Sequence, residues 1–403
     1  MSADRKVPEI RFKGFSGGWK NSELHELALF NPKNELPESF NYVDLESVKG
    51  TSLIGYRVEI KNKAPSRAQR LAQKGDVFYQ TVRPYQKNNY LFNEDGDDYV
   101  FSTGYAQLRP YCDGHFLLNL VQRDPFVKQV LDNCTGTSYP AINAFVLATL
   151  EVSNPEIEAE QTQIGNYFQK LDTLINQHQK KHDKLCNIKK AMLEKMFPKQ
   201  GETIPEIRFR KFSGEWKSDI LESVVSFYKG KNLPKSSIQD DGVFPCIHYG
   251  ELFTKYSEVI EVVTSRTNQN DNFFSISNDV LMPTSDVTPK GLVKSCCIKQ
   301  SGVVLGGDIL IIRPEDKNVI DGAFLSRFIR SREQQVLQNV TGTTVFHLYA
   351  SSIEKLDIVF PFIEEQNAIS NYFQKLDNLI NQHQQQITKL NNIKQACLSK
   401  MFV

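Results

Sequence analysis

The sequence lacks the long apolar segments and the cysteine pattern of a membrane or secreted protein. None of its hydrophobic runs reaches the roughly 18 residues of a spanning helix, and Met1–Lys6 is polar and charged, unlike a signal peptide. The seven cysteines are odd in number, irregularly spaced and without a Cys-x-x-Cys pair. Such cysteines are typical of free thiols in a reducing cytosol, with Cys296–Cys297 as a minor alternative metal site. We therefore expect a cytoplasmic protein.

The overall charge carries no sign of a nucleic-acid partner. The 48 Lys and Arg residues nearly balance the 47 Asp and Glu residues and leave a net charge of +1. A basic surface for a nucleic acid would therefore have to be local.

Recognisable catalytic motifs are also absent. The 403 residues contain no phosphate loop, no Rossmann glycine motif, no His-Glu-x-x-His zinc motif and no nucleophile elbow. The Asn-Pro-Pro-Tyr tetrapeptide of methyltransferases that act on amino groups of DNA bases is missing too. Asp97–Asp98 and Asp240–Asp241 lie in turn-like surroundings, which favours solvated loops over acid–base pairs. We predict no catalytic residue, no metal site and no cofactor in this chain.

The chain contains an internal repeat of one sequence unit. Val7–Trp19 returns as Ile204–Trp216, and both tryptophans of the protein lie in this repeat. Other segments that recur in the second copy are Gln129–Thr137 with Gln335–Thr343, Asn166–Asp172 with Asn371–Asp377, Asp76–Val77 with Asp279–Val280, and Arg109–Pro110 with Arg313–Pro314. Between these repeated segments the two copies diverge almost completely. Two domains with a similar framework would therefore present two different surfaces.

The pattern predicts an α+β protein with two similar globular domains, residues 1–155 and 201–360. Two long helices, residues 156–200 and 361–403, follow the domains, and we expect them to pack as an antiparallel coiled coil with pseudo-twofold symmetry. About 42 helical residues would give a rod of roughly 60 Å. The apolar seam of this pair is predicted to contain Ile164, Phe168, Leu171, Ile175 and Leu185, and Ile369, Phe373, Leu376, Ile380 and Leu390.

Both globular domains mix short strands with one longer helical segment. Strands are predicted at Asp76–Tyr79, Gln107–Arg109, Val303–Leu305 and Asp308–Ile312. Helical periodicity covers residues 116–133 and 323–339, and each segment leads directly into Thr-Gly-Thr.

Basic and polar residues are concentrated in short segments of each half, although the net charge of the whole chain is close to zero. Basic residues gather between Arg57 and Lys87, and the segments after two predicted strands mix the side chains that reach bases and phosphates. The candidate DNA-binding residues are Lys61, Lys63, Arg67, Arg70, Thr81, Arg83, Tyr85, Gln86, Lys87 and Asn88, with Thr284, Ser285, Asp286, Thr288 and Lys290 in the second half. Solvated surface loops are the alternative interpretation.

The two Thr-Gly-Thr segments add further candidates. A loop around Gly136 or Gly342 offers backbone N–H groups to a phosphate, and a helix C-cap is the competing interpretation. The residues concerned are Thr137, Ser138, Tyr139, Thr343 and Thr344.

The ordered, duplicated set of motifs resembles the specificity subunit of type I restriction–modification systems. The likeness covers essentially the whole chain. It is carried by Pro8-Glu-Ile-Arg-Phe12, Trp19, Gly75-Asp-Val77, Thr81-Val-Arg-Pro84, Thr135-Gly-Thr137, Glu160-Gln161 and Ile164–Phe197 with their second-half counterparts. The second copy has Asn278 in place of Gly75 and lacks the Val-Arg-Pro.

The resemblance implies that each globular domain is a target-recognition domain that reads one half of a split site in double-stranded DNA, while the helices fix the spacing. It also implies two methyltransferase subunits that bring S-adenosylmethionine, and restriction–translocase subunits that use ATP and Mg²⁺. The chain itself would then be a non-catalytic subunit. Because the two domains diverge, we expect an asymmetric site, and binding that weakens with salt.

Two other functions are compatible with parts of the sequence. A coiled-coil scaffold that binds only proteins would explain the helices but not the different polar loops on matching frames. An enzyme with an unrecognised site, such as a nuclease, would have to cleave DNA alone with a divalent metal.

Overall fold

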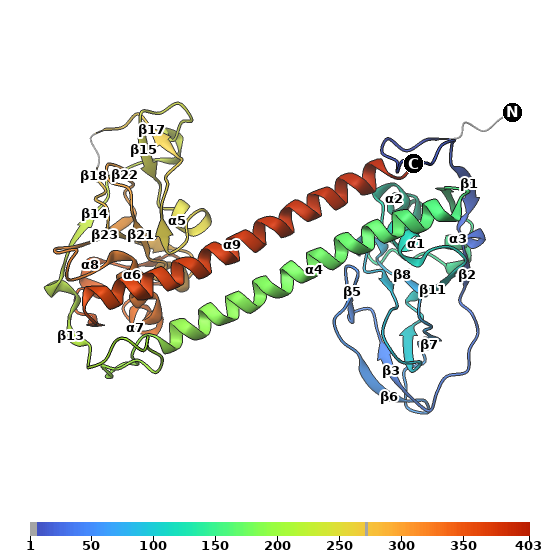
Figure 1. Cartoon of the computed structure of the whole chain (residues 1–403), viewed down its shortest axis with the longest axis horizontal. Coiled ribbons are helices and arrows are strands. Elements are labelled where there is room, and N and C mark those ends of the chain that lie inside the picture. The colour runs from blue at the N-terminus through green and yellow to red at the C-terminus, as the bar shows by residue number, and fades with distance from the viewer. Residues whose placement is uncertain (1–5, 271–272) are drawn as a thin grey trace. The chain divides into compact units, whose positions relative to one another are not determined.

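The computed structural model describes residues 6–270 and 273–403 and divides the chain into two compact units. The first unit contains the residues up to 180 together with 384–403, and the second contains 181–383 (Figure 1). Each long helix therefore contributes its beginning to one unit and its end to the other. No helix within the described ranges has the length and apolar character needed to cross a membrane.

In the first unit, two four-stranded sheets carry the core. Their orders are β6-β3-β10-β7 and β2-β11-β8-β9, and β3 and β10 run parallel. Two further pairs, β1-β12 and β4-β5, complete the strands. The elements are β1 (Lys20–Glu23), β2 (Ala28–Phe30), β3 (Ser39–Val43), β4 (Val48–Lys49), β5 (Ser52–Leu53), β6 (Arg57–Ile60), β7 (Ala68–Leu71), β8 (Val77–Gln80), β9 (Tyr90–Leu91), β10 (Tyr99–Ser102), β11 (Tyr105–Pro110), β12 (Glu151–Asn154), α1 (Gly114–Val121), α2 (Asp124–Asp132), α3 (Ala144–Ala148) and α4 (Glu158–Lys195), whose first part lies here.

The second unit has a five-stranded sheet, β14-β23-β19-β21-β16, and a four-stranded sheet, β17-β15-β22-β18. The second unit also contains a three-stranded sheet, β20-β25-β24, and the strand pair β13-β26. The elements are β13 (Lys217–Ile220), β14 (Val225–Lys229), β15 (Phe244–Ile247), β16 (Val259–Ile260), β17 (Arg266–Thr267), β18 (Phe273–Phe274), β19 (Val280–Pro283), β20 (Ser285–Asp286), β21 (Cys296–Ile298), β22 (Val304–Leu305), β23 (Ile309–Pro314), β24 (Thr341–Gly342), β25 (Phe346–His347), β26 (Asp357–Phe360), α5 (Glu251–Thr254), α6 (Gly322–Ser331), α7 (Glu333–Leu337), α8 (Ala350–Ile353) and α9 (Ile363–Lys400). The predicted α+β class is confirmed.

The prediction of one continuous helix before each Thr-Gly-Thr segment was wrong. The chain breaks after Val121 and starts α2 at Asp124, where Pro125 occupies a position that tolerates a missing N–H. The second copy breaks at Arg332, between α6 and α7. Asp113 and Asp321 cap the first helix of each pair by accepting from the N–H of Phe116 and Phe324.

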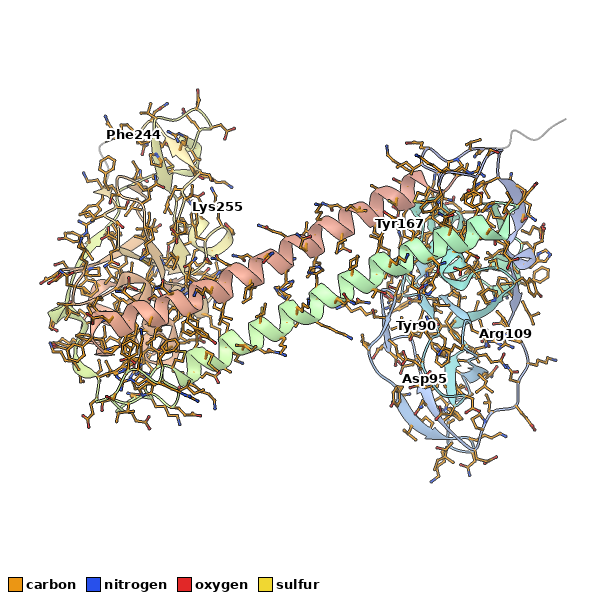
Figure 2. All side chains as sticks on the ribbon, viewed as in Figure 1. Tyr90, Asp95, Arg109, Tyr167, Phe244 and Lys255 are labelled. Atoms are coloured by element: carbon orange, nitrogen blue, oxygen red, sulfur yellow. The ribbon has the colours of Figure 1, made fainter. Side chains whose placement is uncertain are left out.

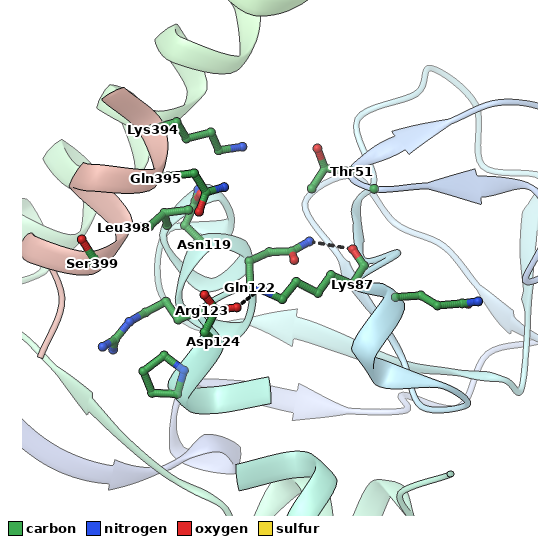
Figure 3. Close-up of a pocket in the computed structure, with 13 residues that line it drawn as sticks. Thr51, Lys87, Asn119, Gln122, Arg123, Asp124, Lys394, Gln395, Leu398 and Ser399 are labelled. Atoms are coloured by element: carbon green, nitrogen blue, oxygen red, sulfur yellow. Dashed lines mark hydrogen bonds and ion pairs between the residues drawn. The ribbon is translucent and has the colours of Figure 1, made fainter. Parts of the chain in front are cut away.

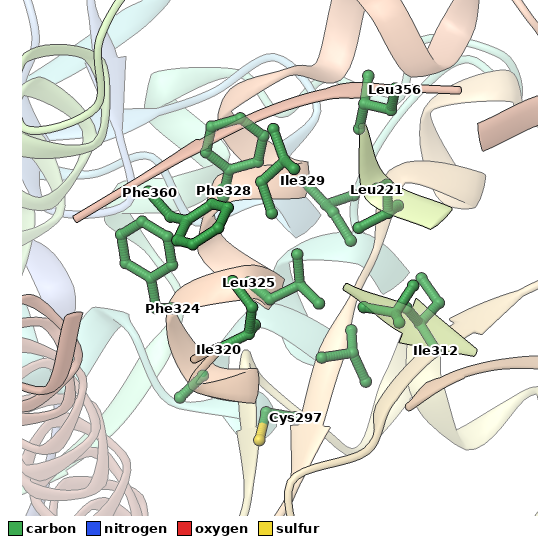
Figure 4. Close-up of a cluster of buried hydrophobic side chains, with 14 of the residues drawn as sticks. Leu221, Cys297, Ile312, Ile320, Phe324, Leu325, Phe328, Ile329, Leu356 and Phe360 are labelled. Carbon is green, nitrogen blue, oxygen red and sulfur yellow. The ribbon is translucent and has the colours of Figure 1, made fainter. Parts of the chain in front are cut away.

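The core of each unit is closed by a phenylalanine from the end of a long helix. In the first unit Phe402 lies with its ring centroid 5.9 Å from Trp19, 5.6 Å from Phe116 and 5.8 Å from Phe168. In the second unit Phe197 lies 6.4 Å from Trp216, 5.3 Å from Phe324 and 6.3 Å from Phe373. Figure 4 shows the part of the second core around Phe324, Phe328 and Leu221.

The predicted helix seam continues into the cores of the globular domains. Its first residues lie in clusters that contain both domain residues and the end of the other long helix: Ile164, Phe168 and Leu171 in the first unit, and Ile369, Phe373 and Leu376 in the second. The later positions Ile175, Leu185, Ile380 and Leu390 are only half-buried.

Contacts between the two long helices within each unit are antiparallel. In the first unit Tyr167, labelled in Figure 2, places its hydroxyl 3.6 Å from Sγ of Cys397, and Lys394 lies 2.6 Å from Asp172. In the second unit Lys189 lies 2.6 Å from Asp377. A continuous coiled coil stays a prediction.

The repeated Pro-Glu-Ile-Arg-Phe segment attaches each unit to the start of its own long helix. Arg11 donates two hydrogen bonds of 2.7 Å to the buried carboxylate of Glu160. Arg208 makes the same pair with Glu365 at 2.7 and 2.6 Å. Such two-pronged arginine–carboxylate pairs fix orientation as well as distance, which explains why this segment occurs twice.

A cluster of charges in the second unit links its domain to both long helices. Lys189 lies 2.8 Å from Glu258 and also contacts Asp377, while Arg330 approaches Glu258 and Arg327 approaches Asp377, each at 3.4 Å. Burial alone would raise the pKa of Glu258, but the charges of Arg330 and Lys189 outweigh it and lower the pKa to about 2. Burial and the neighbouring Glu258 raise the pKa of Asp377.

The aromatic core predicts a large effect of truncating Phe168. In a Trp216→Phe background, Trp19 reports the first unit alone. We expect Phe168→Ala to lower the free energy of unfolding of that unit by about 3–5 kcal/mol, because it leaves a cavity in the core. Urea unfolding followed by tryptophan fluorescence measures this. Leu174→Ala, at a half-exposed position of the same helix, is the control and should change stability by less than about 0.5 kcal/mol. Equal effects would contradict the assignment.

The charge cluster predicts a pH-dependent effect of Glu258→Gln. The folded pKa of Glu258 lies below its ordinary 4.5, so the stabilisation is present above pH 4.5 and is lost as the pH falls toward 2. We expect the variant to be less stable than the parent by on the order of 3 kcal/mol at pH 7, with the difference shrinking below pH 4.5. Unfolding of the second unit, followed through Trp216 in a Trp19→Phe background, measures this. A difference that does not change with pH would contradict it.

Candidate nucleic-acid interface

The structure brings together two segments of the first unit that the sequence proposed separately. Strand β8 leads into residues 81–89, and these pair with residues 135–142. The N–H of Ile142 donates to the carbonyl of Thr81 at 3.0 Å, Val82 pairs with Ala141, and the N–H of Arg83 donates to the carbonyl of Pro140 at 2.8 Å. We call residues 81–89 and 135–142 the first loop cluster.

The second unit repeats this arrangement at equivalent positions. The N–H of Leu348 donates to the carbonyl of Thr284 at 3.0 Å, as Ile142 does to Thr81. Ser285 and Thr341 both pair with His347, as Val82 and Thr135 both pair with Ala141. We call residues 284–290 and 341–348 the second loop cluster.

One buried ion pair holds the strand that delivers each cluster. Asp76, just before β8, accepts two hydrogen bonds of 2.9 Å from Arg109 of β11, which is labelled in Figure 2. Asp279, just before β19, accepts hydrogen bonds of 2.7 and 2.8 Å from Arg313 of β23. The hydrogen bonds to these carboxylates raise the pKa of both arginines. The strands that carry the loop clusters are thus held by ion pairs that involve none of the exposed loop side chains.

In the first loop cluster, Arg83 and Lys87 have a left-handed backbone conformation that is rare for residues other than glycine. Their φ angles are +53° and +54°, in the left-handed region that favours glycine, and they flank the short 3₁₀ helix η2 (Pro84–Gln86). The guanidinium of Arg83 lies 4.3 Å from the ring centre of the exposed Tyr139. Strained backbone of this kind gathers at functional loops.

Lys87 lies at the edge of a polar pocket of about 360 Å³ (Figure 3). Its ammonium group pairs with the exposed Asp124, and its carbonyl accepts from Nε2 of Gln122 at 3.1 Å. The neighbouring Asn88 accepts from the N–H of Gly50 at 2.8 Å, which ties the β4–β5 hairpin to the first loop cluster. Arg123, Lys394 and Gln395 also line the pocket.

Several predicted contact residues lie outside the clusters or turn inward. Lys61, Lys63, Arg67 and Arg70 lie on or next to β6 and β7, in the other sheet, and burial lowers the pKa of Arg70. Thr81 and Thr284 are buried, and the hydroxyl of Thr81 donates to the carbonyl of Gly104 at 2.8 Å. Asp286 accepts from the N–H of Val287 and the hydroxyl of Thr288. Thr81, Thr284 and Asp286 therefore support the loops.

The remaining candidates are accessible. Tyr85, Gln86, Thr137, Ser138, Tyr139, Thr288, Lys290, Thr343 and Thr344 are exposed, and Asn88 and Ser285 are half-buried. Sequence reasoning missed Val287 and Val345, which are 71% and 44% exposed in the second loop cluster. The only available signal was a valine between polar loop residues.

The helix C-cap interpretation of the two glycines was wrong. Helix α2 ends at Asp132 with Asn133 as its cap, so Gly136 lies beyond it, in the turn between the paired residues Thr135 and Ala141. Gly342 belongs to β24. Their φ angles are +84° and +116°, which suit glycine at these tight turns.

The two adjacent cysteines are buried thiols. Burial raises the pKa of Cys296 to about 11 and that of Cys297 to about 12. Within residues 6–270 and 273–403, no group of three or more His, Cys, Asp or Glu side chains is placed to hold a metal ion.

Comparison with known proteins shows what this arrangement is similar to. Residues 213–392 match the family model described as the type I restriction modification DNA specificity domain. This part of the chain is thus similar to that domain, in agreement with the predicted resemblance.

Relatives and solved structures agree with this family. The MjaVIII type I restriction enzyme specificity subunit of Methanocaldococcus jannaschii is 21% identical over 281 residues, 66% of this chain and 64% of that protein. The HindI specificity subunit of Haemophilus influenzae is 27% identical over 140 residues, 33% of this chain and 30% of that protein. The match thus spans less than two thirds of the length of either relative.

The fold is shared with solved structures over nearly the whole chain. A type I restriction–modification S subunit from M. genitalium superimposes with a TM-score of 0.65, 13% identity and 99% coverage of both chains. A chain from a study of complex assembly and conformational transition of a type I system gives 0.52, with 20% identity and coverage of 96% and 97%. The ion pair and the loop cluster that lie within or next to residues 213–392 recur in the first unit, as Asp76–Arg109 and the first loop cluster.

The turn geometry predicts a graded effect of placing alanine at three glycines. A Cβ at Gly342 would lie 2.1 Å from the carbonyl oxygen of Val345, and one at Gly136 would lie 3.1 Å from that of Tyr139. We expect Gly342→Ala to speed amide exchange across β24 and β25 by about tenfold or more, and Gly136→Ala to act less strongly on residues 135–141. Gly14→Ala, with φ +98° but open space around it, lies outside both clusters; it is the control and should leave both segments unchanged. Hydrogen–deuterium exchange measures all three.

Proposed function

We propose that this chain is a DNA-reading specificity subunit in which each loop cluster reads one half of a bipartite, asymmetric site in double-stranded DNA. The observation that carries the proposal is the pair of loop clusters built on the same frame with different exposed side chains. A protein that reads two different half-sites needs this combination, because the frame sets position and the loops set sequence. A scaffold that binds only proteins gives no reason for it.

In the first loop cluster, Arg83 is the side chain best suited to read a base. A guanidinium group can donate two hydrogen bonds to O6 and N7 of guanine in the major groove. The ring of Tyr139 lies under this group and limits its orientations before DNA arrives, which lowers the entropy lost on binding. Around it, Lys87 and the exposed hydroxyls of Thr137 and Ser138 are suited to phosphate contacts that fix the register.

The catalytic steps would then belong to other subunits. Methyltransferase subunits with S-adenosylmethionine, and restriction–translocase subunits with ATP and Mg²⁺, stay predictions from the family. The same holds for a non-catalytic role of this chain and for a spacing between half-sites that depends on α4 and α9.

The role of Arg83 predicts that Arg83→Ala changes the methylated sequence at one half-site only. Loss of a two-pronged contact to guanine costs about 1–3 kcal/mol and relaxes specificity at one base pair. The measurement is a methylome comparison of hosts that carry the parent or the variant gene with the same methyltransferase partner.

The control is Arg57→Ala, which removes an exposed arginine of the same unit outside the first loop cluster. It should leave the specified bases unchanged. Equal relaxation of both half-sites by Arg83→Ala would contradict the assignment. No sequence-specific methylation by the parent, despite a stable complex with the partner, would overturn the proposed function in favour of a scaffold.

A further inference from the structure

The second loop cluster ends in two exposed valines. Strand β20 pairs with β25 so that Ser285 faces His347 and Asp286 faces Phe346. Continuing this register by one residue sets Val287 opposite Val345. Both are exposed, at 71% and 44%, so the tip of the sheet presents apolar surface to water.

This tip is held rigidly from below. Leu348, which follows β25, is fully buried, and so is Leu292 in the 3₁₀ helix η5 (Pro289–Val293) that follows Val287. Gly342 allows the tight turn between β24 and β25, where even a Cβ would collide with the carbonyl of Val345. The two valines are therefore held in place, and a ligand that covers them would remove their apolar surface from water, which favours binding.

The surroundings of the tip fit DNA. Thr288, Thr343 and Thr344 are exposed around it. The ammonium of Lys290, whose side chain is 81% exposed, lies 3.6 Å from the carboxylate of Glu333 in a solvent-exposed ion pair. The carboxylate of Asp286 is turned back into its own loop by hydrogen bonds from Val287 and Thr288. The polar rim thus offers hydroxyls and a cation to phosphates.

A valine side chain neither donates nor accepts a hydrogen bond. Of the groups that the four bases display in the major groove, the C5-methyl of thymine is apolar, whereas the others are hydrogen-bond donors or acceptors. From this geometry we infer that Val287 and Val345 contact a thymine methyl group in the half-site read by the second unit. The inference rests on the proposed function and assigns a base to one of its two sites.

The first loop cluster shows that the tip is a variable position on the common frame. The residue equivalent to Val345 is Tyr139, which lies against Arg83. At the position equivalent to Val287 stands Pro84, which is buried. One frame therefore carries an arginine–tyrosine pair in the first half and an aliphatic pair in the second, which suit bases of different chemistry.

The test replaces single thymines by uracil, which lacks only the methyl group. The full-length chain, in complex with its methyltransferase partner, is titrated with duplexes that carry the methylated site and one uracil at each thymine position in turn. We expect one position in one half-site to weaken binding about fourfold, the contribution of one buried methyl group. In Val287→Thr, which keeps the shape and replaces a methyl by a hydroxyl, thymine and uracil at that position should bind equally.

Val345→Thr is the second variant and should reduce the same discrimination. Val262→Thr, which changes another exposed valine of the second unit, 68% exposed, is the matched control and should preserve it. If the parent binds its site specifically but no thymine methyl matters, or if the discrimination survives in both tip variants, the inference is wrong and the proposed function stands. Failure of the folded complex to bind any sequence specifically would overturn both, and would favour a protein ligand for the tip.

Discussion

The contact between a tryptophan and a phenylalanine from the end of a long helix is the interaction on which both units depend. Trp19 receives Phe402 and Trp216 receives Phe197, and in each unit the first turns of the other long helix complete the aromatic core. At the start of each of these helices, Arg11 pairs with Glu160 and Arg208 with Glu365. The helix ends are thus structural parts of the globular units rather than appendages to them.

The strands and ion pairs above this core are stabilised by interactions that do not involve the exposed loop side chains. The ion pairs Asp76–Arg109 and Asp279–Arg313 hold the strands from inside, and the backbone pairing at Ala141 and His347 joins the two loop segments. None of these interactions requires a particular side chain at an exposed loop position. The exposed loop side chains can therefore differ between the two halves, as Arg83 and Val287 do, without loss of the fold. The proposed function requires this property.

Sequence alone was sufficient for the features that repeat. The duplicated ends, the long helices, the α+β class and the family followed from motifs whose spacing is linear in the chain. The pairing of Thr81–Asn89 with Thr135–Ile142 could not be predicted, because a bridge of one residue pair leaves no periodic signal. Likewise, the apolar pattern of Ile164, Phe168 and Leu171 shows that a helix face is buried but not which surface buries it. The inward turn of Asp286 depends on hydrogen bonds to its own loop, which composition does not reveal.

The division of the chain between the two units also has a consequence for synthesis. Residues 181–383 are contiguous, so the second unit has all of its segments as soon as this stretch has left the ribosome. The first unit begins earlier but lacks residues 384–403, and therefore Phe402, until translation reaches them. During that interval Trp19, Phe116 and Phe168 form an open apolar face, the kind of surface that chaperones bind and that aggregation exploits. The half that is translated first is thus the half whose last segment is translated last.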